Sequence, residues 1–427
     1  MQKEKVIQVC GGCNHSLLLT QSKKVYSTGM NENGQLGLGD YNDRYTPSCI
    51  DPKQFNHEKI IQICAGYRHS IALTQNGNVY SWGYSRYGLS VHGNKSHKNK
   101  PEKFDPNCFN NEPIKFISVS ASFSFALTKN NNLYAWGNNY GGQLGLGNTK
   151  DTYEPTLVDS KTYNNEKILK IEGGDDHTLL LTEESDGSTH IHSCGEDKYG
   201  QLGLNSRGNE NTFERIDSNY FMNKKIKDIK AGDYFSLALV QEKDSNETNI
   251  YSWGDNDQGQ LGLGDNENRN TPCQIDLSSF NGQKIISIGN GSCHSFAITK
   301  EHGTNNTKVY AWGDNSRGQL GLGYCNDISK PAPINMEYFK EQSSRTKRSQ
   351  EIVFVSGDCG SYGHSFAITK TGKLFIWGFN NNGQLGLNHC KDMNLPQECC
   401  HELFGVSNTN EKMYKNQYFE DVLFEFD

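Results

Sequence analysis

One short motif, Gly-Gln-Leu-Gly-Leu, recurs along this chain of 427 residues and limits its possible folds more than any other feature. Aligning the sequence on this motif gives seven units, and repeats of this length indicate similar supersecondary units that pack on one another. Residues 5–405 are therefore predicted to form one array, although the length alone would allow two or three domains. The units start near residues 5, 59, 113, 167, 225, 284 and 351. Six motif copies begin at Gly34, Gly142, Gly200, Gly259, Gly318 and Gly383, and a diverged copy spans residues 88–93.

Each unit contains four strand signals, and unit two shows the first three most clearly. Apolar runs at residues 60–63, 70–74 and 79–82 are separated by short polar turns. A weaker fourth signal contains a proline, as at residues 46–50 of unit one, and proline lacks the N–H that a central strand donates. The fourth strand is therefore expected at the outer edge of each sheet.

Seven units of four antiparallel strands predict an all-β fold, a seven-bladed β-propeller. A solenoid is the competing arrangement. Its terminal units would need atypical polar sequences that cover the ends, whereas units one and seven are as regular as the others. A closed ring is therefore favoured.

Composition restricts the class of protein further. The net charge of −7 argues against a surface that binds nucleic acid. No apolar run reaches about 18 residues, so no transmembrane helix is expected, and residues 1–5 lead into a strand without a signal-peptide core. Thirteen cysteines at irregular spacing fit a reducing compartment. We expect a monomeric propeller in the cytoplasm, with the nucleus as an alternative location.

Two patterns resemble chemical sites but align with ordinary positions of the repeat. Cys10 and Cys13 form a C-x-x-C pair, but no second pair completes a zinc site. A histidine also recurs at one repeat position, where Phe123 and Phe235 replace it in units three and five. A catalytic histidine is not expected at several equivalent points of a ring, so this position is predicted to be structural. The histidines are His15, His69, His177, His294 and His364.

The tryptophans and glycines of the repeat are also predicted to be structural. All five tryptophans precede the glycine that follows the third strand, where large aromatic side chains would pack between blades. No tryptophan remains for a surface cluster. The glycine-rich motif lacks the strand–helix context of a phosphate-binding loop. We expect no catalytic residue, no small-molecule active site, no cofactor and no metal ion.

The order Gly-x-x-His-Ser, Ala-Leu-Thr, then Val-Tyr-x-Trp-Gly-x-Asn-x-x-Gly-Gln-Leu-Gly-Leu-Gly resembles the regulator of chromosome condensation repeat. The resemblance covers about residues 5–405 and implies a seven-bladed propeller. That family includes a guanine-nucleotide exchange factor for the GTPase Ran, ubiquitin-ligase components, ciliary proteins and a plant photoreceptor. The missing extra tryptophans argue against the photoreceptor. A fold that serves so many activities does not determine the function.

Alternating strand directions assign the loops to two faces. The first face carries the turns between first and second strands and the Gly-Gln-Leu-Gly-Leu loops. The resemblance implies that acidic turns of the Gly-x-Asp-His type approach the GTPase in the Ran exchange factor. Residues 174–177 match this turn, and Asp233 lies in a partial match, so Asp176, His177 and Asp233 are candidate partner-binding residues. The absence of a basic N-terminal tail and of an inserted β-wedge near unit three weakens the exchange-factor hypothesis.

The second face carries the hairpins between second and third strands and the links between units. The hairpins have four residues in units one, two, three and seven, eight in unit four and nine in units five and six. Loops on a rigid scaffold commonly bind partners, so this sector is a second candidate site, with drift in tolerant loops as the alternative. Its candidate residues are Glu183, Glu184, Asp186, Glu242, Asp244, Glu247 and Glu301, with Arg345, Lys347 and Arg348 on the link from unit six to seven. That link is also a weak nuclear-localisation match, with a solvated charged loop as the alternative.

Residues 406–427 depart from the repeat. A polar linker is followed by alternating apolar residues near residues 422–426, which fit a strand. This run resembles the opening of a BTB domain, which follows some propellers of this family and recruits cullin ubiquitin ligases. Either the chain is a truncated propeller–BTB protein, or the strand docks on the propeller rim.

These observations favour a non-catalytic propeller for protein interaction and regulation, with a protein partner such as a ubiquitin-ligase component. The substrate-recognition part of a ubiquitin-ligase adaptor is one such role. The alternative is a guanine-nucleotide exchange factor for a small Ran-like GTPase.

Overall fold

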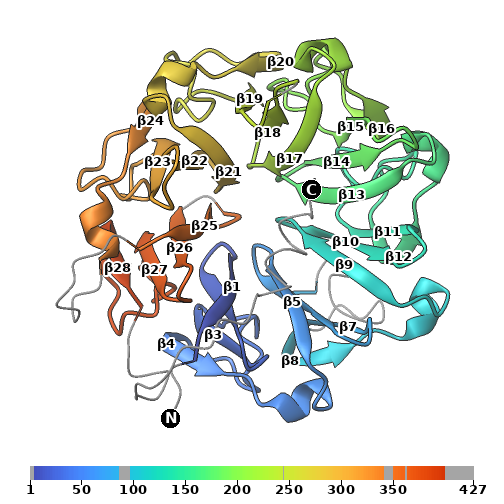
Figure 1. Cartoon of the computed structure of the whole chain (residues 1–427). Coiled ribbons are helices and arrows are strands. Elements are labelled where there is room, and N and C mark those ends of the chain that lie inside the picture. Colours follow the sequence, from blue (N-terminus) through green and yellow to red (C-terminus); the bar gives the residue numbers. More distant parts are fainter. Residues whose placement is uncertain (1–3, 86–96, 244, 341–349, 361–362, 400–427) are drawn as a thin grey trace.

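A computed structural model of the chain describes residues 4–85, 97–243, 245–340, 350–360 and 363–399. These residues form seven four-stranded antiparallel sheets arranged as blades around a central axis (Figure 1). In each blade the strands follow the order of the sequence, with the first strand nearest the axis and the fourth at the rim. The predicted seven-bladed propeller and the outermost position of the fourth strand are both confirmed.

The bounds of the elements repeat from blade to blade. The first strands are β1 (Val6–Gly11), β5 (Ile60–Ala65), β9 (Ile114–Val119), β13 (Lys167–Gly173), β17 (Lys225–Ala231), β21 (Lys284–Asn290) and β25 (Ile352–Gly357). The second strands are β2 (His15–Thr20), β6 (His69–Thr74), β10 (Phe123–Thr128), β14 (His177–Glu183), β18 (Phe235–Gln241), β22 (His294–Lys300) and β26 (His364–Thr369). The third strands are β3 (Val25–Gly29), β7 (Val79–Gly83), β11 (Leu133–Gly137), β15 (Thr189–Gly195), β19 (Thr248–Gly254), β23 (Thr307–Gly313) and β27 (Leu374–Gly378). The outer strands are β4 (Arg44–Cys49), β8 (Lys98–Lys103), β12 (Thr152–Leu157), β16 (Glu210–Arg215), β20 (Arg269–Gln274), β24 (Ile328–Pro333) and β28 (Met393–Glu398).

The burial of each strand explains its sequence. Every residue of β6 is buried, because blades pack against both faces of the middle strands, so this strand can be apolar on both sides. In the outer strand β4 only Pro47 is buried, beside Gly386 of blade seven, and its missing N–H is tolerated because no further strand follows. The middle strand is therefore buried along its whole length, whereas the outer strand is largely polar and partly exposed.

A short 3-10 helix follows each outer strand in blades one to six, and the sequence analysis missed it. In blade one, η1 (Pro52–Phe55) starts at Asp51, whose side chain accepts a hydrogen bond from the backbone N–H of Lys53. Its Phe55 is buried against Tyr80 and Trp82 of the next blade. Burial of such a ring contributes about 1.5–3 kcal/mol. The other helices are η2 (Pro106–Phe109), η3 (Ser160–Tyr163), η4 (Ser218–Phe221), η5 (Leu277–Phe280) and η6 (Met336–Phe339).

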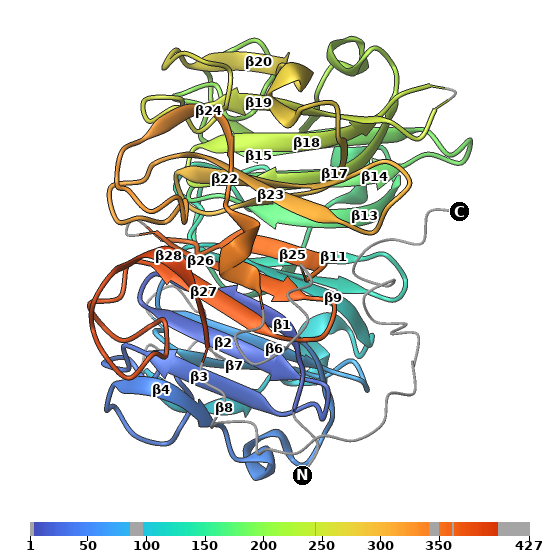
Figure 2. The ribbon, with the colours of Figure 1, turned by 60° about the vertical axis from the view of Figure 1, so that its left-hand side comes forward.

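The hydrophobic core lies between blades rather than within them. One cluster joins Leu17 and Leu19 of blade one to Ile63 and Trp82 of blade two. The ring closes in the same way, because another cluster joins Val9 of blade one to strand β26 of blade seven. The first and last blades lie side by side in both Figure 1 and Figure 2. No strand among the described residues is shared between blades, so side-chain packing and a few hydrogen bonds close the ring.

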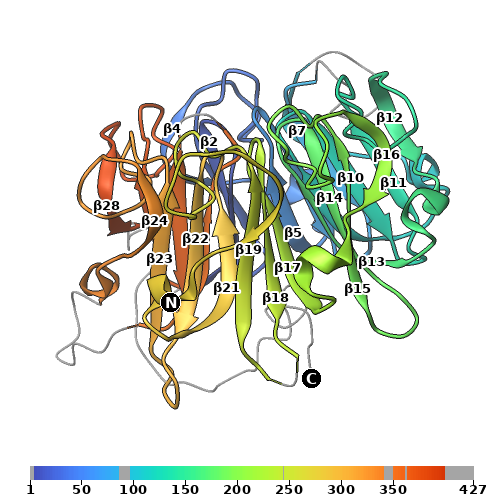
Figure 3. The same cartoon turned by 90° about the horizontal axis from the view of Figure 1, so that it is seen from above.

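The predicted long hairpins of blades four to six are extensions of the β-ladders. Strand pairing continues to Glu183 and Thr189 in blade four, to Gln241 and Thr248 in blade five and to Lys300 and Thr307 in blade six. The hairpins of blades five and six reach the lower edge of the molecule in Figure 3.

Several predicted features lie outside the described residues. They are the diverged motif at residues 88–93, Asp244, the candidate residues Arg345, Lys347 and Arg348, and the tail at residues 406–427 with its BTB-like strand. In the part of the chain that the structure describes, no helix is long and apolar enough to cross a membrane.

Candidate functional site

The repeated histidines join successive blades. His15 Nε2 lies 3.0 Å from Ser70 Oγ of the next blade, and both residues are buried. A Cβ atom at Gly12 would lie 2.2 Å from His15 Cε1, so the preceding turn requires glycine. The same contact joins His69 to Ser124, His177 to Ser236, His294 to Ser365 and, across the ring closure, His364 to Ser16.

The Gly-Gln-Leu-Gly-Leu loop supplies the other half of this junction. The carbonyl oxygen of Gln35 accepts hydrogen bonds from Ser70 Oγ at 2.9 Å and from Trp82 Nε1 at 2.8 Å. Because the serine proton goes to this carbonyl, His15 Nε2–H donates to the serine. Burial lowers the pKa of His15 to about 3, which agrees with a neutral ring. These buried contacts join successive blades, as the predicted structural role of the repeat histidines and tryptophans requires.

Acidic residues that do not repeat gather at one end of the central channel. Tyr67 of blade two donates a 2.8 Å hydrogen bond to Asp175 of blade four. These blades are not neighbours, so the contact spans the channel. Cys359 Sγ of blade seven likewise donates to the carbonyl of Ala65 at 3.0 Å. We call Asp175, Asp176, Asp233 and Asp358 the acidic mouth; all four lie in turns between first and second strands.

Burial and mutual repulsion dominate the electrostatics of the acidic mouth. Burial raises the pKa of Asp233 well above its ordinary value, and the charges of Asp175, Asp358 and Asp176 raise it further. Burial and Asp175 raise the pKa of Asp176 to about 6. No lysine or arginine is among the groups that perturb the pKa values of Asp175, Asp176 or Asp233. The described part of the mouth therefore concentrates carboxyl groups without a matching lysine or arginine, and His364 is the basic side chain that contacts Asp358.

The structure places the three candidates of this face differently. Asp233 is 6% exposed and Asp176 is half-buried, with Gln143 Nε2 donating to it at 3.1 Å. His177 is fully buried and joins blade four to blade five, so its side chain faces the blade junction rather than solvent. The sequence analysis missed Asp175 and Asp358. Asp175 lies in the turn at residues 174–177 but was not selected. Asp358 lies in a lengthened turn of blade seven, at the position that glycine occupies in blade one.

The candidate acidic residues of the long hairpins are largely used within their own blades. Glu183 pairs with Lys167 at 3.0 Å, and Glu242 pairs with Lys224 at 2.6 Å. Asp186 and Glu301 accept hydrogen bonds from residues of their own turns, and Glu247 donates its backbone N–H to Ser245. These residues lie on three separate hairpins, each anchored locally.

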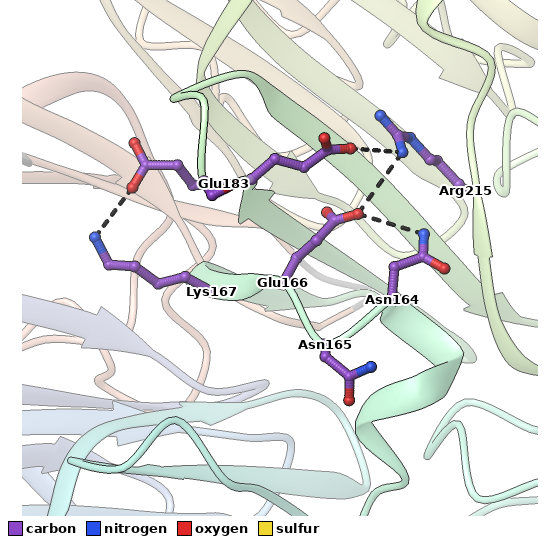
Figure 4. Close-up of a pocket in the computed structure, with 8 residues that line it drawn as sticks. Asn164, Asn165, Glu166, Lys167, Glu183 and Arg215 are labelled. Atoms are coloured by element: carbon purple, nitrogen blue, oxygen red, sulfur yellow. Dashed lines mark hydrogen bonds and ion pairs between the residues drawn. The ribbon is translucent and has the colours of Figure 1, made fainter.

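A polar pocket of about 740 Å³ lies at the base of the blade-four hairpin (Figure 4). Arg215 on its wall contacts Glu184 at 2.9 Å and Glu166 at 3.7 Å. His190 Nε2 lies 3.1 Å from the same Glu184, and burial followed by the Arg215 charge lowers the pKa of His190. The pocket is thus a network of paired charges that contains two of the candidate residues, Glu183 and Glu184.

One set of residues at the ring closure resembles a catalytic triad. Ser16, His364 and Asp358 are linked in the order of a hydrolytic triad, at 3.0 and 2.8 Å. Ser16 is fully buried, however, and donates its proton to the carbonyl of Gln384 at 2.8 Å. Among the described residues no group of three or more histidine, cysteine or acidic side chains is arranged to hold a metal ion.

The seven blades share one type of junction, which contains the His–Ser contact at five places, and their sequence differences gather at the channel mouth; these features define a repeat propeller of the protein-binding type. The chain belongs to the RCC1-like domain family. The model of that domain matches residues 1–297, and the Regulator of chromosome condensation (RCC1) repeat matches residues 307–368 and 371–403.

Among curated proteins, the ultraviolet-B receptor UVR8 of Arabidopsis thaliana is 31% identical over 394 residues, which are 92% of this chain and 81% of the receptor. The E3 ubiquitin-protein ligase HERC2 of Homo sapiens is 30% identical over 327 residues, which are 76% of this chain but only 6% of the ligase. Among solved structures, Prp20p from Saccharomyces cerevisiae has the same fold, with a TM-score of 0.71, 20% identity and coverage of 93% of this chain and 87% of that chain. These relatives support a protein-interaction and regulatory role.

Proposed function

We propose that this propeller is a non-catalytic interaction module that binds a protein partner over the acidic mouth. The observation that carries the proposal is the position of Asp233. Its side chain is only 6% exposed and faces carboxylates from two other blades, and burial raises its pKa. A buried carboxyl group without a paired cation is held in its protonated form, and a cationic partner would favour its charged form. Groups whose pKa values are strongly perturbed concentrate at functional sites.

The partner that we favour is a ubiquitin-ligase component or substrate. The similarity to HERC2 supports this proposal, because HERC2 is an E3 ubiquitin-protein ligase. In such an assembly the propeller would recognise a substrate and another chain would transfer ubiquitin. The activity of UVR8 is not carried over, because all five tryptophans of this chain are fully buried.

Nucleotide exchange on a small Ran-like GTPase is the second candidate. It is favoured by the turn at residues 174–177, which places Asp175 and Asp176 at the acidic mouth. The propeller would displace the contacts that hold the nucleotide and its magnesium ion, and no covalent bond would change. Catalytic amounts of the protein should then accelerate GDP release from the GTPase, whereas a binding module would show no turnover.

The experiment that tests the proposed function compares the two faces. Cells expressing the tagged propeller are subjected to proximity labelling and pull-down, together with two variants. Asp175→Ala/Asp176→Ala alters the acidic mouth, and the second variant trims the hairpins at residues 183–190, 241–249 and 300–308 to the four residues found in the other blades. We expect the mouth variant to lose the main partner and the trimmed variant to retain it. The reverse result would move the binding site to the hairpin face, and no specific partner for the native chain would overturn the proposal.

A further inference from the structure

We infer that the acidic mouth is a receptor for one basic side chain, a lysine or arginine, presented by a protein partner. This inference rests on the proposed interaction function and names the chemistry that the site recognises. The residues that would hold the basic group are Asp175, Asp233 and Asp358, from blades four, five and seven.

The carboxylate oxygens of the mouth have unused hydrogen-bonding capacity. Asp175 Oδ2 accepts the Tyr67 hydroxyl, but its Oδ1 is buried without a partner. Asp358 Oδ2 lies 2.8 Å from His364 Nδ1, and its Oδ1 is also buried without a partner among the described residues. No hydrogen bond or ion pair from the described residues reaches the carboxylate of Asp233. Buried polar groups are normally satisfied, so three incompletely satisfied carboxylates at one place indicate a missing donor.

A positively charged donor fits this cluster best, because it would favour the charged form of every carboxyl group. The groups that face Asp233 are Asp175, Asp176 and Asp358, and the neutral groups around them are the phenols and thiols of Tyr67, Tyr234, Cys293 and Cys359. None of these can neutralise a carboxylate. A cation would remove the repulsion among the acids and supply several hydrogen bonds, and charge-assisted hydrogen bonds are the stronger ones.

The surroundings fit an organic cation better than a metal ion. The described residues contain no grouping suited to a metal, whereas aromatic rings surround the rim. Tyr199 and Tyr234 lie with their ring centroids 5.3 Å apart, and the Lys198 ammonium is already 4.8 Å from the Tyr199 ring centre. Aromatic faces attract ammonium and guanidinium groups. Because Asp233 is almost fully buried below this rim, a long side chain such as lysine or arginine is suited to reach it.

The inference is tested with a labelled peptide of alternating Lys and Gly, whose binding to the full chain is followed by fluorescence anisotropy. We expect salt-sensitive binding that weakens about tenfold or more in Asp175→Asn/Asp233→Asn, because a charge-assisted hydrogen bond contributes about 1.5–3 kcal/mol. An arginine version should bind and a lysine-acetylated version should not. Glu247→Gln/Glu301→Gln removes the same charge from the opposite face and should leave the affinity unchanged.

The two asparagine substitutions preserve side-chain shape, and a thermal melt of each variant confirms that it is folded. Equal binding of the acetylated peptide, or equal binding by the Asp175→Asn/Asp233→Asn variant, would overturn the inference. Binding of calcium ions, measured by calorimetry, with no binding of the lysine peptide would overturn the inference and identify an inorganic-cation site instead. If the variant still recovers the native partner in the pull-down, the basic-side-chain inference fails while the interaction function stands.

Discussion

Asp358 and His364 form a 2.8 Å hydrogen bond between fully buried side chains, and through Ser16 this pair connects blade seven to blade one. Nδ1 of His15, at the equivalent position of blade one, has no hydrogen-bond partner. The junction that closes the ring therefore has one more fixed contact than that between blades one and two.

Asp358→Ala should weaken the closure of the ring. It removes the carboxylate that holds His364 Nδ1 and leaves this buried nitrogen without its hydrogen bond, which costs about 1–3 kcal/mol. Urea unfolding followed by tryptophan fluorescence should show this loss in the free energy of unfolding. Asp358→Asn retains an acceptor oxygen and should be less destabilising. Equal stability of the alanine variant and the native chain would show that the hydrogen bond contributes nothing to closure.

His15→Phe should make the fold less sensitive to acid. The folded-state pKa of His15 is about 3 and its ordinary value is 6.5, so the unfolded chain binds a proton in this range and the folded chain does not. Stability is therefore lost as the pH falls below about 6.5. Phenylalanine is accommodated naturally at Phe235, where Ser295 keeps its hydrogen bond to Gln260.

The test measures unfolding free energies of the native chain and His15→Phe at pH 7.5 and pH 5. Between pH 7.5 and pH 5, the native chain should lose about 1–2 kcal/mol more of its free energy of unfolding than the variant does. Parallel loss of stability in both proteins would show that His15 does not contribute to the acid response.

Asp197→Asn should stabilise the fold at neutral pH. Asp197 stands where most other blades have a buried asparagine, and burial raises its pKa from 3.8 to about 6. The folded protein therefore binds this proton more tightly than the unfolded chain does. Protonation of Asp197 stabilises the fold at low pH, and this stabilisation is lost as the pH rises through about 6. The amide removes this dependence, and its NH₂ can donate to the loop as Asn256 Nδ2 does to Asp265.

We expect the Asp197→Asn variant to have a free energy of unfolding about 0.5–2 kcal/mol higher than the native chain at pH 7.5, with a smaller increase at pH 5. The reciprocal variant Asn256→Asp, in the equivalent loop of blade five, should lose stability with the opposite pH dependence. A gain that is the same at both pH values would rule out titration of Asp197 as its cause.

Arg215→Gln should raise the pKa of His190. The guanidinium contacts the Glu184 carboxylate beside this histidine, and its charge adds to burial in lowering that pKa. NMR titration of the histidine ring signals measures the change directly. Lys167→Gln is the matched control, because Lys167 pairs with Glu183 on the same hairpin. An unchanged His190 titration in Arg215→Gln would mean that burial alone sets its pKa.

The fold could be predicted from the sequence in detail because the same pattern of strand and turn residues recurs in seven units. Alternation, the edge proline and the recurring tryptophan each follow from backbone hydrogen bonding and packing, which are local. The 3-10 helices could have been found from the spacing of Asp51 and Phe55, which recurs in later units. Those residues lie in stretches that resemble ordinary turns, so their packing against the next blade was not evident.

The acidic mouth was only partly predictable, because it depends on residues far apart in the chain. Asp176 and Asp233 could be selected from a turn pattern. Asp358 could not, since its turn is longer than the others and its electrostatic influence on Asp233 arises only when blades five and seven face the same channel. The relation of Tyr67 to Asp175 has the same origin.

Each blade is built from one uninterrupted segment of chain. A whole unit can therefore be exchanged for another. The chain can also be circularly permuted at any link between blades without dividing a sheet. For evolution and for protein engineering, this means that the residues of the mouth can be exchanged one turn at a time while the order of the ring is kept.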